Sequence, residues 1–492
     1  MRVLLIWPEV PDTFWGFKSA VEFIDKRATQ PPLGLLTVAA LLPVQWEKRL
    51  VDMNVGALED EDLLWADYVL LSGMDIQRQS FEKVVARCNR LGVPVVAGGS
   101  LCTAHYDEID GVDHFVLNEA EITLPGFLED LERGDPQPVY STDQFPDLAA
   151  TPIPLWHLLD MDKYVSMDVQ YSRGCPYDCE FCSITTLFGR RVRTKDTEQF
   201  LCELESLRLA GWRGSVFVVD DNFIGNKRKL RQEFLPALVQ WSESRGRPFE
   251  FYTEVSIDLA DDDRLVELMV RAGFRMVFVG IETPDEESLR ECNKVQNRGR
   301  DLLESVRSLQ RSGLEVTAGF IVGFDHDQPN IFDRQIRFIQ QSGIVTAMVG
   351  LLNVPVGTRL YRRMKDEKRL LNTTSGNNVD TSLNFVPKMS AKALVQGYRR
   401  IQQTIYSPQA YFERIVTFLS EHRLLPFSPQ KFSWLDLRAF LRAVWKLGIL
   451  DEGRRYFWKL LLLVGKRFPK KLPQAVTLAV QGFHLRRVAE AL

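Results

Sequence analysis

The amino-acid sequence predicts an α/β protein in three parts. These are an N-terminal doubly wound, Rossmann-like domain over residues 1–150, a partial (β/α)6 barrel of the TIM type over 151–365, and a mainly helical C-terminal domain over 366–492. Two patterns favour this division: apolar runs of strand length alternate with helical stretches in the first two parts, and amphipathic helical stretches follow. The 492 residues are 45% hydrophobic and 26% charged, which is typical of a globular protein of about two to four domains.

The first part contains five apolar runs separated by helical stretches, which indicates a parallel sheet covered on both faces. Ligands of such sheets bind beyond the carboxyl ends of the strands, where Gly98-Gly99-Ser100 is expected. The expected strands are Val3–Trp7, Lys48–Asp52, Asp67–Ser72, Val93–Ala97 and His114–Leu117, and the expected helices are Leu33–Leu42 and Phe81–Leu91.

The second part follows a polar, proline-rich stretch, Asp135–Ile153, which we interpret as a linker. A complete eight-unit barrel needs about 250 residues, so six units predict an open, partial barrel with its chemistry in the loops after the strands. The expected strands are Val169–Tyr171, Ser215–Val219, Glu250–Thr253, Met276–Val279, Val316–Ile321 and Ala347–Leu351. The helices expected between them are Thr197–Ala210, Leu230–Ser244, Asp262–Ala272, Asp301–Ser312 and Ile331–Ser342.

The third part has the helical stretches Ala391–Tyr406, Ala410–Glu421, Trp434–Leu447 and Arg454–Leu463. Residues 431–492 contain 13 Lys and Arg against 4 Asp and Glu, whereas the whole chain has a net charge of −4. Aromatic and basic residues around short apolar runs suit a helix at a membrane interface, so residues 431–492 are a candidate for peripheral membrane contact. A solvated helical bundle with snorkelling Lys and Arg remains an equal alternative.

Several classes of protein do not fit this composition. The 31 Gly show no three-residue period, the 7 Cys are too sparse for a disulfide scaffold, and the net charge argues against a nucleic-acid partner. The apolar run at the N-terminus is too short for a signal peptide and is closed by Pro8. We therefore expect a cytoplasmic protein with reduced cysteines. Peripheral association with the inner face of the membrane is the second localisation that the sequence allows.

Three cysteines in one short loop carry the chemistry. Cys175, Cys179 and Cys182 are spaced Cys-x3-Cys-x2-Cys directly after the first barrel strand. Three thiolates can hold three corners of a cubane iron–sulfur cluster and leave the fourth iron open to another ligand. The alternative is a zinc site that takes a distant fourth ligand such as Cys202.

This loop, with Phe181 before its last cysteine, resembles the signature of the radical SAM superfamily. The resemblance implies that the three cysteines hold a [4Fe–4S] cluster and that S-adenosylmethionine (SAM) chelates the open iron. Electron transfer to SAM would then give a 5′-deoxyadenosyl radical. The resemblance also suggests a set of SAM-binding residues at the strand ends: Phe181, Asp220, Asp221, Asn222, Glu254, Glu282, Ile321 and Gly323. Helix N-capping by Asp220–Asn222 and ordinary turn chemistry at the glycines stay open.

A parallel sheet ahead of such a barrel resembles the cobalamin-binding subfamily. The blocks Asp220–Asn226, Glu282-Thr283-Pro284 and Lys294–Asn297 are similar to the branch that includes the hopanoid C-2 methylase and the bacteriochlorophyll side-chain methylases. No Asp-x-His-x-x-Gly occurs, which fits a cobalamin without a histidine below cobalt, and a decayed domain is the alternative. The cobalamin-binding residues expected from the resemblance are Pro32, Leu33, Gly34, Asn54, Ser72, Gly73, Met74, Gly98, Gly99, Asn118 and Glu119.

The resemblance implies methylation of an unactivated carbon in a lipid, pigment or other secondary metabolite. One SAM would methylate cob(I)alamin, a second would supply the radical that abstracts a substrate hydrogen, and methylcobalamin would deliver the methyl group. A reductase, flavodoxin or ferredoxin would supply electrons to the enzyme, and a hydrophobic small-molecule substrate is favoured. A non-methylating cobalamin radical SAM cyclase or rearrangement enzyme, and a cobalamin or iron–sulfur sensor without turnover, are the alternatives.

The remaining singled-out residues are given simpler roles. His105 and His114 are expected to be loop histidines. Arg190, Arg191 and Arg193 could meet a phosphate or carboxylate, or cap helix C-termini. The other four cysteines, Cys88, Cys102, Cys202 and Cys292, are expected to be buried structural thiols.

Overall fold

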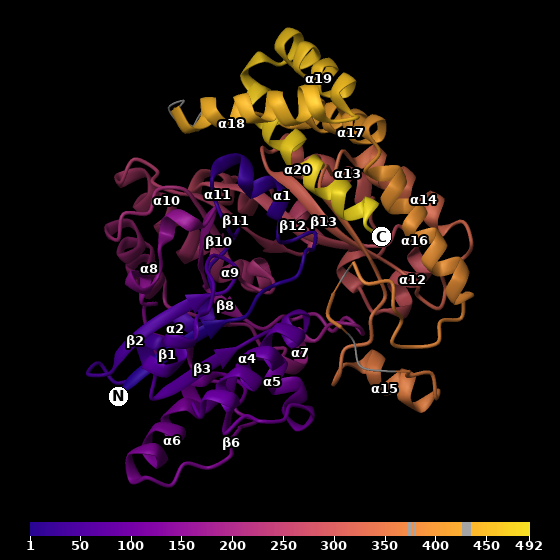
Figure 1. Ribbon diagram of the computed structural model, residues 1–492. Coiled ribbons are helices and arrows are strands. Elements are labelled where there is room, and N and C mark those ends of the chain that lie inside the picture. The colour runs from indigo at the N-terminus through magenta and orange to yellow at the C-terminus, as the bar shows by residue number, and fades with distance from the viewer. Residues whose placement is uncertain (372–374, 378, 426–433) are drawn as a thin grey trace.

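The computed structural model describes residues 1–371, 375–377, 379–425 and 434–492, and it confirms the predicted α/β fold. Two six-stranded parallel sheets form the body of the molecule (Figure 1). Their strand orders are β2-β1-β3-β4-β5-β6 and β14-β13-β12-β11-β10-β7, and a short antiparallel pair, β8-β9, lies beside them. Helices gathered at the C-terminus complete the chain.

The N-terminal sheet is covered on both faces, as its apolar strands require. Alternate strand residues such as Leu5 and Val96 pack under helices α2 (Leu33–Leu41) and α6 (Ala120–Arg133). The others, such as Leu71, pack under α3 (Asp60–Trp65), α4 (Arg78–Leu91) and α5 (Gly99–His105). The strands are β1 (Arg2–Trp7), β2 (Glu47–Asp52), β3 (Tyr68–Ser72), β4 (Val95–Gly98), β5 (His114–Val116) and β6 (Val139–Tyr140). Strand β6 lies inside the stretch expected to be a linker, because two residues carry too little pattern to predict a strand.

The barrel sheet contains the six predicted strands, which pair side by side in the order in which they occur in the chain. The first strand begins and ends earlier than expected. It does not reach Tyr171, because the N–H of Tyr171 donates to the carboxylate of Asp220 instead of joining the sheet. The strands are β7 (Ser166–Val169), β10 (Ser215–Val218), β11 (Glu250–Val255), β12 (Phe274–Glu282), β13 (Glu315–Val322) and β14 (Ala347–Leu351). The covering helices are α8 (Thr197–Leu209), α10 (Leu235–Ser244), α11 (Asp263–Ala272), α13 (Leu302–Arg311) and α14 (Ile331–Ser342).

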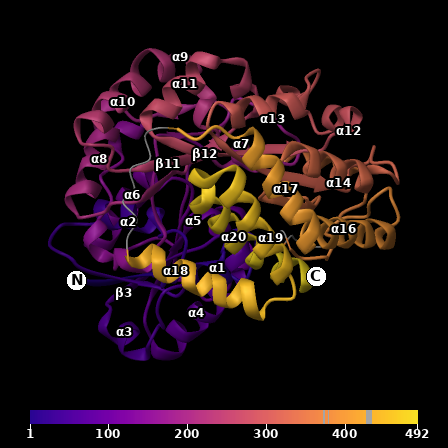
Figure 2. The same ribbon diagram turned by 90° about the horizontal axis from the view of Figure 1, so that it is seen from above.

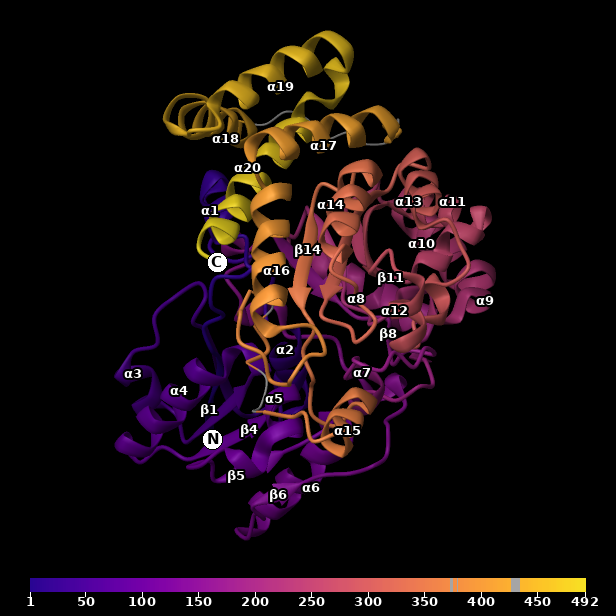
Figure 3. The ribbon, with the colours of Figure 1, turned by 90° about the vertical axis from the view of Figure 1, so that its right-hand side faces the viewer.

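The last helices of the chain pack against the end of the barrel where the strands begin, whereas α15 lies at the opposite end, where Arg363 pairs with Glu180 and Asp325. Arg414, which is fully buried, donates to the carbonyl of Val345 just before β14 (3.1 Å) and to that of Ile405 (2.7 Å). Figures 1 and 3 show α17, α18 and α19 at the opposite end of the molecule from the N-terminal sheet. The helices are α15 (Arg359–Asp366), α16 (Ala391–Ile405), α17 (Pro408–Glu421), α18 (Trp434–Trp445), α19 (Arg454–Arg467) and α20 (Leu472–Glu490), with the π-helical turn η11 (Lys446–Leu450) after α18.

Residues 8–32, which we call the strap, pack against helix α20. Together they connect the first and last parts of the chain. The strap follows β1 and carries α1 (Lys18–Val21) and η1 (Glu22–Ile24), which lie beside α20 and α18 (Figure 2). His484 Nε2 lies 2.9 Å from the carbonyl oxygen of Thr13, and the rings of Phe23 and Phe483 meet edge to face. No helix among the described residues is both long and apolar enough to cross a membrane.

The carboxyl of Glu315 at the start of β13 gives a pH-dependent prediction. Burial raises its pKa from the usual 4.5 to about 7, against a hydrogen bond with Gln474 of α20 that lowers it. Because the pKa of Glu315 is higher in the folded than in the unfolded protein, its protonated form favours folding. This contribution to the free energy of unfolding is complete below pH 4.5 and is lost as the pH rises through 7. We expect Glu315→Gln to raise the free energy of unfolding at pH 8 by about 1–3 kcal/mol and to change it little at pH 4.5. Thermal unfolding at both pH values measures this, with exposed Glu132→Gln as the control; equal effects at both pH values would contradict it.

Candidate functional site

Carboxylates at the end of β10 hold the loop that carries Cys175, Cys179 and Cys182, which we call the cluster loop (residues 170–182). Asp220 accepts hydrogen bonds from the N–H of Tyr171 (2.8 Å) and the hydroxyl of Ser172 (2.5 Å). Asp221 accepts one from the N–H of Gly174 (2.9 Å). These bonds join the first two strand ends of the barrel, so the loop's path is fixed by its neighbouring strand.

Gly174 is needed where the cluster loop turns toward its first cysteine. Its φ is +90°, a left-handed conformation that side chains disfavour. A Cβ atom there would also lie 2.9–3.0 Å from the carbonyl oxygens of Arg191, Gly189 and Phe188. The glycine therefore permits a close approach of two backbone segments beside Cys175.

The surroundings of the three thiols suit thiolate ligands of an iron–sulfur cluster. Burial raises the pKa of Cys175, and raises that of Cys182 to about 12, so deprotonation would accompany metal binding. Amide N–H groups point at two of the sulfurs: Asn222 Nδ2 lies 4.0 Å from Cys175 Sγ, and Gln296 Nε2 lies 3.7 Å from Cys179 Sγ. Such donors stabilise sulfur that carries negative charge.

The remaining cysteines do not assemble a zinc site around this loop. Cys202, the alternative fourth ligand, is exposed on α8, which corrects the expectation that it is a buried thiol. Cys88, Cys102 and Cys292 are buried as expected. Within the described part of the chain, no three His, Cys, Asp or Glu side chains are grouped to hold a single metal ion.

Polar residues at the next strand ends surround the cluster loop. Asn222 makes no helix-capping bond and instead accepts from the N–H of Ser256 (3.1 Å). Glu254, at the end of β11, is enclosed, and burial together with the charge of Asp221 raises its pKa to about 7. Glu282 has a left-handed φ of +63° and forms a 2.6 Å ion pair with Lys294.

The predicted residues of β13 and the cluster loop lie on the same side of the barrel. Phe181 packs against Phe324 with ring centroids 6.2 Å apart. Gly323, with φ +113°, donates its N–H to Asp327 (2.8 Å), and the carbonyl of Ile321 accepts from Gln335 (2.7 Å). The eight residues expected to bind SAM therefore lie at the strand ends near the cysteines, and their contact with SAM stays a prediction.

A cavity of about 290 Å³ lies between the N-terminal sheet and the barrel, among the strand ends of both. This is near the lower end of small-molecule pockets, and cobalamin is larger, so the cavity could enclose only part of that molecule. Seven of the expected cobalamin-binding residues line it: Leu33, Gly34, Ser72, Gly98, Gly99, Asn118 and Glu119. The other four, Pro32, Asn54, Gly73 and Met74, are not among its lining residues.

Backbone close to the cavity is kept free of side chains at Gly98 and Gly99. A Cβ on Gly98 would lie 2.7 Å from the carbonyl oxygen of Val116, and one on Gly99 would lie 2.5 Å from the hydroxyl of Ser72. The two histidines of this domain do not line the cavity. His105 ends α5 and His114 begins β5, which corrects the expectation that both lie in loops.

Buried ion pairs connect the cavity to the cluster loop. Glu119 pairs with Arg173 (2.5 Å) and with Arg193 (2.7 Å), and Glu121 pairs with Arg173 (2.8 Å). The sequence predicted neither Arg173 nor Glu121 as a site residue, because the pairing partners are 52 to 74 residues apart. Arg193 thus meets a carboxylate of the N-terminal domain and also donates to the carbonyl of Phe188 (3.2 Å), the residue that caps the C-terminus of the short helix α7 (Ile184–Leu187), so both expected roles apply to it.

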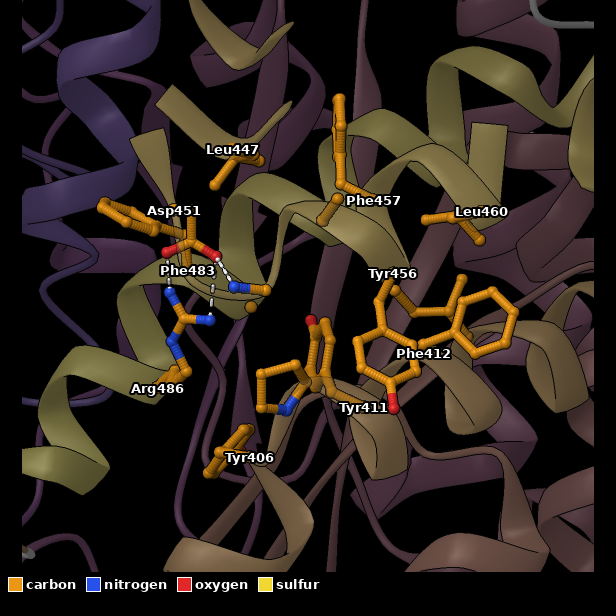
Figure 4. A pocket seen from close by; sticks show the side chains of 15 residues that line it. Tyr406, Tyr411, Phe412, Leu447, Asp451, Tyr456, Phe457, Leu460, Phe483 and Arg486 are labelled. Atoms are coloured by element: carbon orange, nitrogen blue, oxygen red, sulfur yellow. Dashed lines mark hydrogen bonds and ion pairs between the residues drawn. The ribbon is translucent and has the colours of Figure 1, made fainter. Parts of the chain in front are cut away.

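A second cavity, of about 60 Å³, lies among the C-terminal helices (Figure 4). Aromatic side chains, including Tyr411, Phe412 and Tyr456, form much of its wall, and the ion pair of Asp451 with Arg486 lies at one side. None of the residues expected to bind a cofactor lines it. The residues expected to bind cofactors are instead found at the strand ends near the cluster loop and at the larger cavity.

Two segments of the chain match known families. Residues 169–339 match the radical SAM superfamily, and residues 358–492 match a domain of unknown function (DUF4070). The first match begins at the end of β7 and contains the cluster loop.

Two relatives and one solved structure cover almost the whole chain. An uncharacterized methyltransferase of Synechocystis sp. is 40% identical over 100% of this chain and 92% of its own length. Hopanoid C-2 methylase of Rhodopseudomonas palustris is 35% identical over 94% of this chain and 89% of its own length. TsrM of Kitasatospora setae, a radical SAM methyltransferase solved with cobalamin and a [4Fe–4S] cluster, shares the fold with a TM-score of 0.63 at 13% identity, over 100% of this chain and 99% of its own. The predicted family is confirmed: the chain belongs to the radical SAM superfamily, in the branch that includes hopanoid C-2 methylase and the bacteriochlorophyllide methyltransferases.

Proposed function

We propose that this protein is a radical SAM methyltransferase that uses a [4Fe–4S] cluster, SAM and cobalamin to methylate an unactivated carbon of a hydrophobic small molecule. The observation that carries the proposal is the junction of the cluster loop with the large cavity through the ion pairs of Glu119 and Glu121. When bound, the cofactors supply a SAM-derived radical that abstracts a hydrogen atom and a methyl group for transfer to carbon. An external reductase, flavodoxin or ferredoxin completes the proposal as electron donor.

The chain's own residues position these groups and exclude water. Cys175, Cys179 and Cys182 would hold the cluster, on a loop fixed by Asp220 and Asp221. Glu254, enclosed among the strand ends, could accept a hydrogen bond from an ammonium group such as that of SAM. The glycines at 98 and 99 would let backbone approach cobalamin closely.

The inner face of the barrel supports a hydrophobic substrate. Phe217 of β10 and Tyr252 of β11 stack with centroids 4.7 Å apart and planes 7° apart. Trp15 of the strap packs against Phe278 of β12 at 4.9 Å. The parallel register places Asp168, Phe217 and Tyr252 side by side on one face, so aromatic rings and a buried carboxyl lie together below the expected SAM site. Glu254 of β11 and Glu315 of β13 lie on the same face of the sheet. A hopanoid, the substrate class in the name of hopanoid C-2 methylase, suits the aromatic part of this face.

A cysteine substitution tests the cluster directly. After anaerobic reconstitution, Cys175→Ala should lose most of the roughly four iron atoms per chain expected of a cubane cluster, together with its visible absorbance, because one corner ligand is missing. Cys202→Ala should keep both, since Cys202 is exposed on α8. Zinc in the unchanged protein that is lost from both the Cys175→Ala and the Cys202→Ala variants would support the zinc site instead.

We further propose that the outer surface of α18, η11 and α19 contacts an anionic membrane, where a lipophilic substrate would be found. Large apolar side chains on this surface point away from the bundle, while Arg442 and Lys446 on its inner side pair with Asp25 and Glu22 of the strap. The exposed apolar residues are Trp434, Leu435, Leu441, Trp445, Ile449, Leu450, Trp458 and Leu462. Exposed Arg454, Arg455 and Lys459 lie among them in sequence and exposed Lys466 and Lys470 follow them, which is the composition of an interfacial surface. Residues 431–433, at the start of the expected membrane-contact segment, lie outside the described residues.

Liposome flotation tests the membrane contact. The triple variant Leu441→Glu, Trp445→Glu and Leu462→Glu should float with phosphatidylglycerol vesicles at least tenfold less than the unchanged protein, because charge opposes insertion of the surface. The matched control is Val44→Glu, Leu64→Glu and Leu209→Glu, which alters similarly exposed apolar residues elsewhere. Equal flotation of both variants would contradict a membrane surface on these helices. Truncation is less suitable, because it would remove Leu478 and Leu485 of α20 from the core.

A further inference from the structure

A segment that follows β12 encloses the cluster loop from the side opposite to Asp220. Residues 292–297, which we call the 292–297 segment, lie between α12 (Glu286–Glu291) and α13 and end in the turn η10 (Val295–Asn297). The carbonyl of Cys292 accepts from the N–H of Glu180 (2.9 Å), and Asn293 Nδ2 donates to the carbonyl of Asp178 (2.9 Å). Asn297 Nδ2 donates to the carbonyls of Gly280 (3.0 Å) and Ile281 (2.9 Å), which fixes the segment to the end of β12.

This segment brings one ammonium group and one amide into the neighbourhood of the thiols. Lys294 is buried, lies 5.9 Å from the centre of the Phe181 ring, and interacts electrostatically with Cys175, Cys179 and Cys182. Gln296 directs its Nε2 at Cys179 Sγ (3.7 Å), and its Oε1 is buried without a partner among the described residues. A charge and an N–H donor thus face the same sulfur-rich centre.

The ammonium group of Lys294 is held by a residue in a strained conformation. Glu282 pairs with it at 2.6 Å while adopting φ +63°, at the point where the register of β12 against β13 shifts. A left-handed conformation at a non-glycine residue is unfavourable and persists only where the surroundings impose it. A Cβ on Gly280 would lie 2.4 Å from Glu282 Oε1 and 2.7 Å from Lys294 Nζ, so the glycine leaves room for the pair.

We propose that Lys294, placed by Glu282 and assisted by Gln296, raises the reduction potential of the cluster held by Cys175, Cys179 and Cys182. This inference rests on the proposed cluster but not on the reaction that the cluster serves. One electron passes from an external low-potential donor to the cluster, and no bond forms or breaks in that step. The added negative charge is stabilised by a nearby ammonium group and by N–H donors to sulfur, so both residues favour the reduced state.

The test is the midpoint potential of the reconstituted cluster, measured by EPR-monitored titration with the whole chain. Lys294→Met should lower it, making the reduced fraction at a fixed solution potential about tenfold smaller, which corresponds to about 59 mV for one electron. Glu282→Gln should shift it in the opposite direction, because removing the counter-charge leaves the ammonium charge uncompensated. Gln296→Leu should lower it, and Lys294→Arg should retain the original value.

Opposite shifts separate this role from a purely structural one. A structural role would reduce iron content in several variants without moving the potential of the cluster that remains. Arg486→Met is the matched control, since Arg486 forms another largely buried pair, with Asp451 among the C-terminal helices, and should leave the potential unchanged. If Lys294→Met loses its cluster, the Glu282→Gln and Gln296→Leu shifts still test the inference. Unchanged potentials in these variants, or shifts of the same sign in Lys294→Met and Glu282→Gln, would overturn it, whatever the enzyme methylates.

Discussion

The hydrogen bonds from the cluster loop to Asp220 and Asp221 are the constraint on which the active centre depends. Burial raises the pKa of Asp220 to about 7 and that of Asp221 to about 6, but backbone N–H groups of the loop favour their ionised forms. The loop is thereby tied to β10 through its backbone, independently of any metal. Ligands held on such a rigid element keep their geometry, which a radical reaction needs in order to direct one hydrogen abstraction.

Buried charge also joins the parts of the chain. Arg173 and Arg193 extend from the two sides of the cluster loop to Glu119 and Glu121 of the N-terminal domain. Burying ions is costly unless their geometry is good, so these pairs fix one relative placement of cavity and loop. At the other end of the barrel, the strap and α20 connect the first and last residues of the fold. The surface that we assign to the membrane thus belongs to the same body as the cluster loop.

Much of this organisation could be predicted from the sequence, because apolar runs and cysteine spacing are local signals. The six barrel strands and the cluster loop follow from them. The partners of Asn222, Glu119 and Arg193 could not be predicted, since strand register and tertiary packing, rather than local pattern, select them. Lys294 lies 112 residues from Cys182, and only its place in the block Lys294–Asn297 singled it out. Helix α20 was missed because apolar residues lie around much of its circumference: one side packs into the barrel core, and Val476, Val480 and Phe483 pack against the strap and the other C-terminal helices.

The measurement that tests the account most directly is a single anaerobic turnover assay. Protein reconstituted with iron, sulfide and cobalamin is given SAM, a strong reductant and a hopanoid lipid, and the products are quantified by mass spectrometry. The account predicts 5′-deoxyadenosine, S-adenosylhomocysteine and a lipid heavier by one methylene unit, with the deoxyadenosine and the lipid product lost in Cys175→Ala. Deoxyadenosine with a product that has gained no methyl group would contradict it and support a non-methylating radical enzyme.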